Sequence, residues 1–148
     1  SNGPHDPERP SGTVTQEQLD WLDEICTSDD PRPLVVAVHH NVLPMHVPWL
    51  DDWMRMENGE AFHEIVRQAR DRLRGVFHGH IHQNTDVLQD GVLYVAAASS
   101  WCQFVSYPMP ENTRVAPDFT TPPGFSVVTI SDKSMALKRH SIALGDVS

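Results

Sequence analysis

The first half of the chain alternates helical stripes of apolar residues with short apolar runs. Residues 34–38 (Leu-Val-Val-Ala-Val) and 75–77 (Gly-Val-Phe) are short and β-prone, which predicts two buried strands. Ahead of the first run, residues 15–18 have the pattern of a capping box, and apolar residues follow at helical spacing at Leu19, Leu22 and Ile25. Residues 60–73 carry a second helical stripe, made by Phe62, Ile65, Val66, Ala69 and Leu73. The pattern therefore predicts the order helix, strand, helix, strand.

The second half of the chain has the pattern of antiparallel hairpins. Residues 85–88 and 92–95 flank Gln-Asp-Gly, and residues 125–130 and 135–142 flank Ser-Asp-Lys-Ser. Turn residues between two β-prone runs predict a hairpin in each case. Together with the first half, this predicts an α/β fold with a mixed sheet and antiparallel hairpins at its end.

Two long segments rich in proline predict loops, at 41–58 and 101–123. The first also holds methionine and tryptophan residues, so we expect either a lid packed on its own apolar side chains or a wall of a substrate site or dimer contact. Residues 1–12 and the tail after Leu144 are also predicted to be loop.

Composition restricts the classes of partner. The 148 residues suit at most one domain, and the net charge of -9 provides no basic footprint for nucleic acid or an anionic membrane surface. No apolar run approaches the length of a membrane span. The two cysteines, Cys26 and Cys102, form no disulfide framework, so a reducing cytoplasmic location is the simplest interpretation.

Histidines follow both predicted strands of the first half. His39 and His40 come directly after the first apolar run, and His78, His80 and His82 come after the second. The carboxyl ends of adjacent parallel strands meet at one edge of a sheet, so we expect these side chains to converge there. Neutral imidazole is a common ligand of zinc, iron and manganese. The alternatives are loop histidines that bind nothing, or a single open zinc site formed by three of the rings.

The order of these motifs resembles that of the calcineurin-like metallophosphoesterases, and in particular their bacterial cyclic-nucleotide and glycerophosphodiester phosphodiesterases. The resemblance rests on residues 36–40 (Val-Ala-Val-His-His) and 77–82 (Phe-His-Gly-His-Ile-His). Residues 12–22, 99–104 and 123–125 support it. The family's Asp-x-His, Gly-Asp-x-x-Asp and Gly-Asn-His-Asp motifs do not occur here. The resemblance therefore implies that residues 1–148 are the carboxyl-terminal part of one domain with a four-layer α/β/β/α sandwich.

The resemblance also implies a function and a set of site residues. The parent enzyme would hydrolyse a small phosphoester, such as a cyclic nucleotide or a glycerophosphodiester, with hydroxide bound to two divalent metal ions, either manganese, iron or zinc. His39 and His80 would bind one ion and His82 the other. His40 and His78 are the candidates for supporting the ligands or facing the substrate. The fragment alone is expected to be inactive, because the family's bridging carboxylate is absent.

Two other classes of function stay open. The chain could be a module that binds metal without turnover, or a structural or dimerisation module whose histidines bind nothing. A half sandwich would also leave one face of its sheet apolar, which predicts a homo-oligomer.

Overall fold

The apolar runs of the sequence form a four-stranded mixed sheet in the computed structural model of the protein, which describes residues 10–143. Its strands stand in the order β1-β2-β4-β3, where β1 and β2 are parallel, β2 and β4 are parallel, and β3 and β4 are antiparallel. The strands are β1 (Leu34–Ala37), β2 (Leu73–His78), β3 (Thr85–Gln89) and β4 (Val92–Ala96). The predicted α/β class is therefore confirmed. The first nine residues and the predicted tail after Leu144 lie outside the described range.

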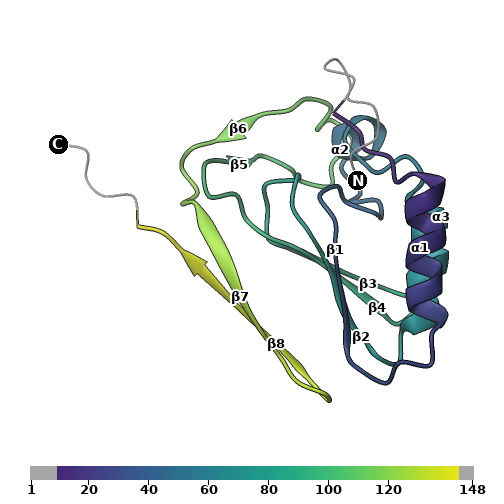
Figure 1. Cartoon of the computed structure of the whole chain (residues 1–148). Helices are drawn as coiled ribbons and strands as arrows, with labels where there is room; N and C mark the ends of the chain where they lie inside the picture. The colour runs from purple at the N-terminus through teal and green to yellow at the C-terminus, as the bar shows by residue number, and fades with distance from the viewer. Residues whose placement is uncertain (1–9, 144–148) are drawn as a thin grey trace.

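Two helices cover one face of this sheet (Figure 1). Helix α1 (Gln16–Thr27) begins with the predicted capping box: the Thr15 hydroxyl accepts from the Gln18 amide at 3.3 Å, and the Thr15 amide donates to the Gln18 side chain at 3.0 Å. Helix α3 (Gly59–Val66) packs beside α1. The shared core includes Leu19, Leu22, Phe62, Val66, Val76 and Tyr94.

Two predictions of local structure were wrong. The predicted helix over 60–73 ends earlier, because α3 stops at Val66, a 3-10 turn η1 (Arg67–Ala69) follows, and Leu73 opens β2 opposite Leu34. Leu73 lies in β2 but packs against the same core as the apolar side chains of α3. Its position in the sequence therefore fits the helical stripe although it is not in the helix. The segment 41–58 is not all loop either: it contains helix α2 (Pro48–Trp53), with proline at its first position.

Both predicted hairpins are confirmed. Asp90 and Gly91, with φ of 51° and 80°, turn the chain between β3 and β4. Strands β7 (Gly124–Ile130) and β8 (Met135–Ser141) pair along their whole length. Between the hairpins, β5 (Gln103–Phe104) pairs with β6 (Pro117–Asp118), so the predicted loop over 101–123 contains a short ladder.

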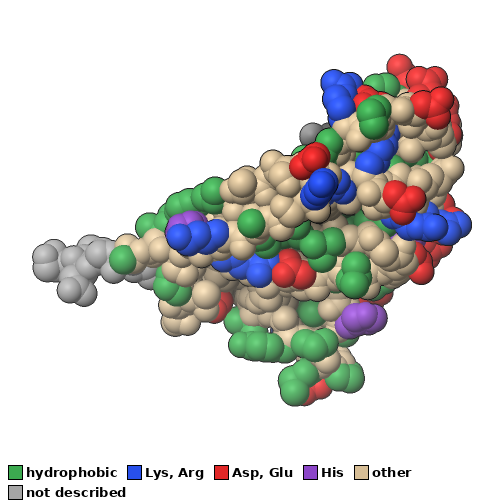
Figure 2. Space-filling model, turned by 90° about the horizontal axis from the view of Figure 1, so that it is seen from below, with side chains coloured by type: hydrophobic (Ala, Val, Ile, Leu, Met, Phe, Trp, Pro, Cys, Tyr) green, Lys and Arg blue, Asp and Glu red, His purple; other side chains and the backbone are tan. Residues whose placement is uncertain are grey.

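The β7–β8 hairpin extends along the side of the sheet away from α1 and α3 (Figure 1). Arg74 donates to the carbonyl of Asp132 in the turn that joins β7 and β8, and Arg139 of β8 pairs with Asp86 of β3. The hairpin nevertheless exposes apolar side chains at Phe125, Val127 and Ile130. Figure 2 shows hydrophobic side chains along the arm that carries this hairpin, between basic and acidic ones. The sheet and the hairpin thus keep apolar surface that the described residues leave uncovered.

Within residues 10–143, none of the helices has the length and apolar character needed to cross a bilayer.

Candidate metal centre

The histidines of the two motifs meet because strand pairing continues beyond β1. The Val38 amide donates to the Phe77 carbonyl at 2.9 Å, and the Gly79 amide donates to the His39 carbonyl at 3.1 Å. These bonds extend the parallel ladder of β1 and β2 into the segments that carry the histidines. His39 is therefore held beside the residues that follow Gly79.

The rings of His39 and His80 face each other closely. Nε2 of His39 lies 3.1 Å from Nδ1 of His80, and the ring centroids are 4.8 Å apart in an edge-on arrangement. Two nitrogens bound at about 2.0–2.1 Å to one ion are separated by about 2.9–3.4 Å for coordination angles between octahedral and tetrahedral. The observed spacing falls within that range, so this pair fits a shared divalent ion.

The backbone of the second motif turns sharply between its two candidate ligands. His80 and His82 have φ of 66° and 51°, in the left-handed region that residues other than glycine adopt infrequently. Ile81 between them is 1% exposed and packs in the cluster that contains Val47 and Leu50. The turn therefore buries Ile81 and directs the two histidines away from the core. Non-glycine residues in such conformations cluster at functional sites.

His82 is oriented by two contacts of its own. Its Nδ1–H donates to the Cys102 carbonyl at 2.8 Å, and its ring stacks on Phe104 at 4.2 Å with an interplanar angle of 4°. A carbonyl can only accept, so Nδ1 carries the proton and Nε2 keeps its lone pair. This is the arrangement of a metal-ligating histidine, whose second nitrogen is fixed by a backbone carbonyl. His82 lies near enough to His39 and His80 to contribute, after desolvation, to the lowering of the pKa of both rings.

His40 and His78, the two candidates for supporting or substrate-facing roles, are both buried. His40 is 7% exposed, and its Nε2–H donates to the Pro10 carbonyl at 3.1 Å. The same carbonyl accepts from Nε2 of His80 at 3.0 Å, so the two rings share one acceptor. His40 also fills the space beside Gly12, where a Cβ would lie 2.2 Å from the ring. His78 is 6% exposed at the end of β2.

Burial keeps several of these rings neutral. Desolvation, with the nearby His40 and His39, lowers the pKa of His80 to about 4. Desolvation also lowers the pKa of His39 and of His78 below the usual histidine value. Neutral imidazole is the form that binds metal, so the rings are in the binding form at neutral pH.

The histidines alone make an incomplete centre. Across residues 10–143, no group of three or more His, Cys, Asp or Glu side chains is arranged to hold a metal ion. Three groups that orient the rings could not be predicted from the sequence, namely the carbonyls of Pro10 and Cys102 and the Phe104 ring. Backbone carbonyls leave no signal in a sequence.

Comparison with known proteins gives the same class of protein as the resemblance of the sequence motifs. No family model matches the chain. The 3',5'-cyclic adenosine monophosphate phosphodiesterase CpdA of Vibrio vulnificus is 28% identical over 121 residues, which cover 82% of this chain and 42% of the relative. A probable cyclic nucleotide phosphodiesterase of Psychrobacter arcticus is 31% identical, covering 77% and 38%. The CpdA protein of Escherichia coli K12 is 27% identical, covering 90% and 46%.

The chain thus spans less than half the length of these curated relatives. Among solved structures, a dimetal phosphatase from Danio rerio matches with a TM-score of 0.62 at 17% identity, covering 88% of this chain and 36% of that one. At that identity the likeness concerns the fold alone. The predicted resemblance to the calcineurin-like metallophosphoesterases is confirmed, and the chain is related to their cyclic-nucleotide phosphodiesterases.

Replacing His80 with alanine should weaken zinc binding by the chain at least about tenfold, because it removes one nitrogen of the 3.1 Å pair. Isothermal titration calorimetry at neutral pH measures this. His140→Ala is the matched control, since His140 stacks on Phe125 in the distant hairpin. The same zinc affinity for His80→Ala and the unchanged chain would contradict the assignment.

Proposed function

We propose that this chain supplies the histidine part of a dinuclear metal site that hydrolyses a small phosphodiester. The observation that carries the proposal is the 3.1 Å approach of His39 Nε2 to His80 Nδ1 at the carboxyl ends of two parallel strands. In this proposal His39 and His80 hold one ion, and His82 contributes to the second. The fixed Nδ1–H of His82 supports that role, because it presents Nε2 as the ligand atom.

In this proposal the remaining ligands come from residues outside 10–143, since no group of three or more candidate ligands is arranged to hold a metal within that range. We therefore infer that residues 1–148 are the carboxyl-terminal portion of one metallophosphoesterase domain. The uncovered apolar side chains of the β7–β8 hairpin support this arrangement, because a second sheet would bury them. The described sheet with α1 and α3 would form two layers of a four-layer sandwich.

Divalent ions such as manganese, iron or zinc supply Lewis acidity, which lowers the pKa of water and offsets charge on phosphate oxygens. The residues of this chain then orient the histidine rings and keep water away from them. Cys102 and Phe104 fix the ring of His82, and the Pro10 carbonyl fixes those of His40 and His80. His40 is thus a positioning residue. His78 is the second candidate for such a role, from the end of β2.

The relatives' names favour a cyclic nucleotide as the substrate, and a glycerophosphodiester is the second candidate. Both carry one phosphodiester, which bridges two hydroxyl groups of one ribose in a cyclic nucleotide and joins glycerol to a second alcohol in a glycerophosphodiester. An alternative function is a module that binds metal without turnover, and the incomplete ligand set within residues 10–143 keeps this alternative open.

The 148-residue chain should bind metal but show little hydrolysis of bis(p-nitrophenyl) phosphate with added manganese or zinc, because no group of three or more His, Cys, Asp or Glu side chains within residues 10–143 is arranged to hold a metal ion. The longest protein encoded by the natural reading frame should hydrolyse the same ester and cyclic AMP. In that protein His39→Ala should lower kcat/KM at least about a hundredfold, since metal catalysis supplies much of the rate.

Three outcomes separate the functions. Full activity of the 148-residue chain would contradict the need for further ligands. Bound metal without turnover in the longest protein would favour the metal-binding module. No bound metal would favour a structural or dimerisation role.

We further propose that the 148-residue chain forms a homo-oligomer through the exposed apolar side chains of β7. Val127, Phe125 and Ile130 are each between 41% and 49% exposed. Burying apolar surface stabilises association by about 25 cal/mol per Å².

Val127→Lys should therefore shift the chain toward monomer in size-exclusion chromatography with light scattering. Trp21→Ala, which changes an exposed residue of α1, is the control. Association would be contradicted if the unchanged chain were monomeric at a concentration on the order of tens of micromolar, where an interface of moderate affinity is occupied.

A further inference from the structure

Residues 10–14 form a strap beside the histidines of the candidate metal centre. The Pro10 carbonyl in this strap accepts from Nε2 of His40 and of His80, at 3.1 and 3.0 Å. Gly12 lies against the His40 ring, where a Cβ would be 2.2 Å away from it. The strap must therefore be held in one place if the Pro10 carbonyl is to face both rings.

The turn that precedes helix α3 holds the strap with both backbone and side chain. Gly12 forms a parallel bridge with Met56, and the Glu57 amide donates to the Gly12 carbonyl at 2.8 Å. Asn58 then bonds both polar groups of the Val14 backbone: its Nδ2 donates to the carbonyl at 2.7 Å, and its Oδ1 accepts from the amide at 3.1 Å. One side-chain amide thus takes the place of a neighbouring strand, which would offer the same donor and acceptor.

Asn58 uses its side chain on the strap instead of on its own helix. It is the N-cap residue of α3, and asparagine at this position usually accepts from an amide in the first turn of the helix. Within residues 10–143 its side chain makes no such bond, because Oδ1 faces the Val14 amide. The contribution of this side chain is therefore to the strap and not to the capping of α3.

The same turn is fixed to the segment that carries the first two histidines. The Met56 amide donates at 3.0 Å to the carbonyl of Asn41, which directly follows His40. Met56 is itself fully buried. Gly59 packs against the backbone beyond Asn41, since a Cβ there would lie 2.1 Å from the Val42 carbonyl oxygen. Asn58 thus stands on a support that cannot move independently of the histidines.

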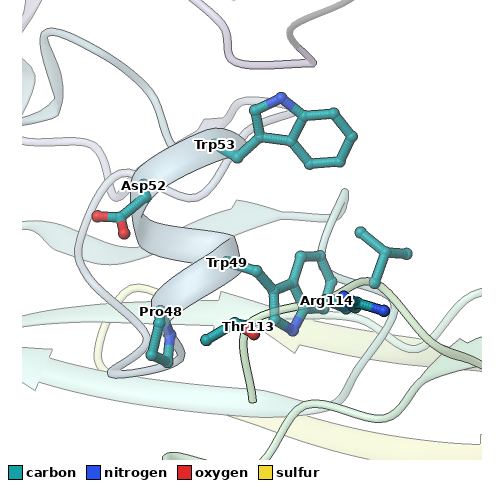
Figure 3. Close-up of a pocket in the computed structure, with 7 residues that line it drawn as sticks. Pro48, Trp49, Asp52, Trp53, Thr113 and Arg114 are labelled. Atoms are coloured by element: carbon teal, nitrogen blue, oxygen red, sulfur yellow. The ribbon is translucent and has the colours of Figure 1, made fainter. Parts of the chain in front are cut away.

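Helix α2 anchors the rest of this support. Trp49 is 5% exposed and packs edge-on against Phe104, with ring centroids 5.5 Å apart. Figure 3 shows the Trp49 indole on the side of α2 that faces Arg114, across a pocket that both residues line. Leu50 is buried in the same cluster as Ile81, which lies between two of the candidate ligands. The segment from residue 41 to 58 is therefore packed against the turn of the second histidine motif.

We propose that Asn58 is a positioning residue of the metal centre, which acts through the strap to keep Nδ1 of His80 directed toward Nε2 of His39. The proposal rests on the proposed function only for the role of His80 as a ligand. With the Pro10 carbonyl in place, the proton of the His80 ring stays on Nε2, so Nδ1 keeps the lone pair that a metal requires. Without the Asn58 bonds the strap is released, and the His80 ring loses the acceptor that fixes its orientation.

The test is NMR of the imidazole N–H protons in the ¹⁵N-labelled 148-residue chain, with EDTA at neutral pH. A ring N–H that donates to a carbonyl is protected from exchange with water and gives a signal, whereas an unprotected one exchanges too fast to be observed. The unchanged chain should show Nε2–H signals from His40 and His80. It should also show the Nδ1–H signal of His82, whose acceptor is the Cys102 carbonyl outside the strap.

Asn58→Asp separates capping from the strap, because aspartate caps a helix as well as asparagine but cannot donate to the Val14 carbonyl. Asn58→Ser is the second variant, since serine also caps but is too short to bond both groups of Val14. In both variants the His40 and His80 protons should exchange at least about tenfold faster, while the His82 signal stays.

Zinc affinity, measured by calorimetry, should fall about tenfold in both variants, as is usual when a group that orients a ligand is removed. The added charge of Asn58→Asp would by itself attract zinc, so a fall in affinity cannot be an effect of charge. Asn112→Asp is the matched control, because its Nδ2 donates to the Tyr107 carbonyl away from the strap. This control should change neither the N–H signals nor the affinity.

The proposal would be overturned if the His40 and His80 signals were absent from the unchanged chain, or if they and the zinc affinity persisted in both variants. Loss of the His82 signal as well in both variants would also overturn it, because Asn58 would then support the whole fold and not the strap. Failure of the proposed function is recognised separately: unchanged zinc affinity in His80→Ala would remove His80 as a ligand, whatever the N–H signals show.

Discussion

The candidate centre depends on two backbone hydrogen bonds that lie beyond the end of β1. The bonds from Val38 to Phe77 and from Gly79 to His39 keep the two chain segments paired where the histidines begin. Side-chain contacts alone could not hold His39 Nε2 within 3.1 Å of His80 Nδ1, because each ring adds two rotatable bonds. The parallel ladder does so at little further entropic cost, since its strands are already fixed by the core. The geometry of the site is therefore a consequence of strand register.

The left-handed turn at the second motif balances strain against burial. This conformation costs a residue with a side chain about 1–2 kcal/mol, and both His80 and His82 adopt it. Burying one isoleucine stabilises a fold by about 1.5–3 kcal/mol, and Ile81 is almost fully buried. The His82–Cys102 hydrogen bond adds about 0.5–1.5 kcal/mol. The opposing contributions are similar in size, so the turn is held by its surroundings and not by its own preference. A ligand set that includes residues outside this chain would fix it further.

The sequence predicted the parts of this site that depend on periodicity and chain order. The apolar runs placed His39 and His80 at neighbouring strand ends, and the capping box at Thr15 predicted where α1 begins. The prediction of secondary structure failed where one sequence pattern fits both a helix and a strand: Leu73 fits a helical stripe but belongs to β2. It also could not predict contacts between distant segments, such as Phe104 on His82 or the Pro10 carbonyl between His40 and His80. Those contacts are set by tertiary packing and leave no local pattern.

The fold thus gathers two rings whose nitrogens have a spacing that fits one divalent ion, and a third ring whose Nδ1–H is fixed by a backbone carbonyl. The central claim is that His39 and His80 share an ion, and anomalous diffraction from crystals of the chain grown with zinc tests it directly. We expect an anomalous peak about 2.0–2.1 Å from both His39 Nε2 and His80 Nδ1. A peak bound to other residues, with none at this pair when zinc is saturating, would contradict it.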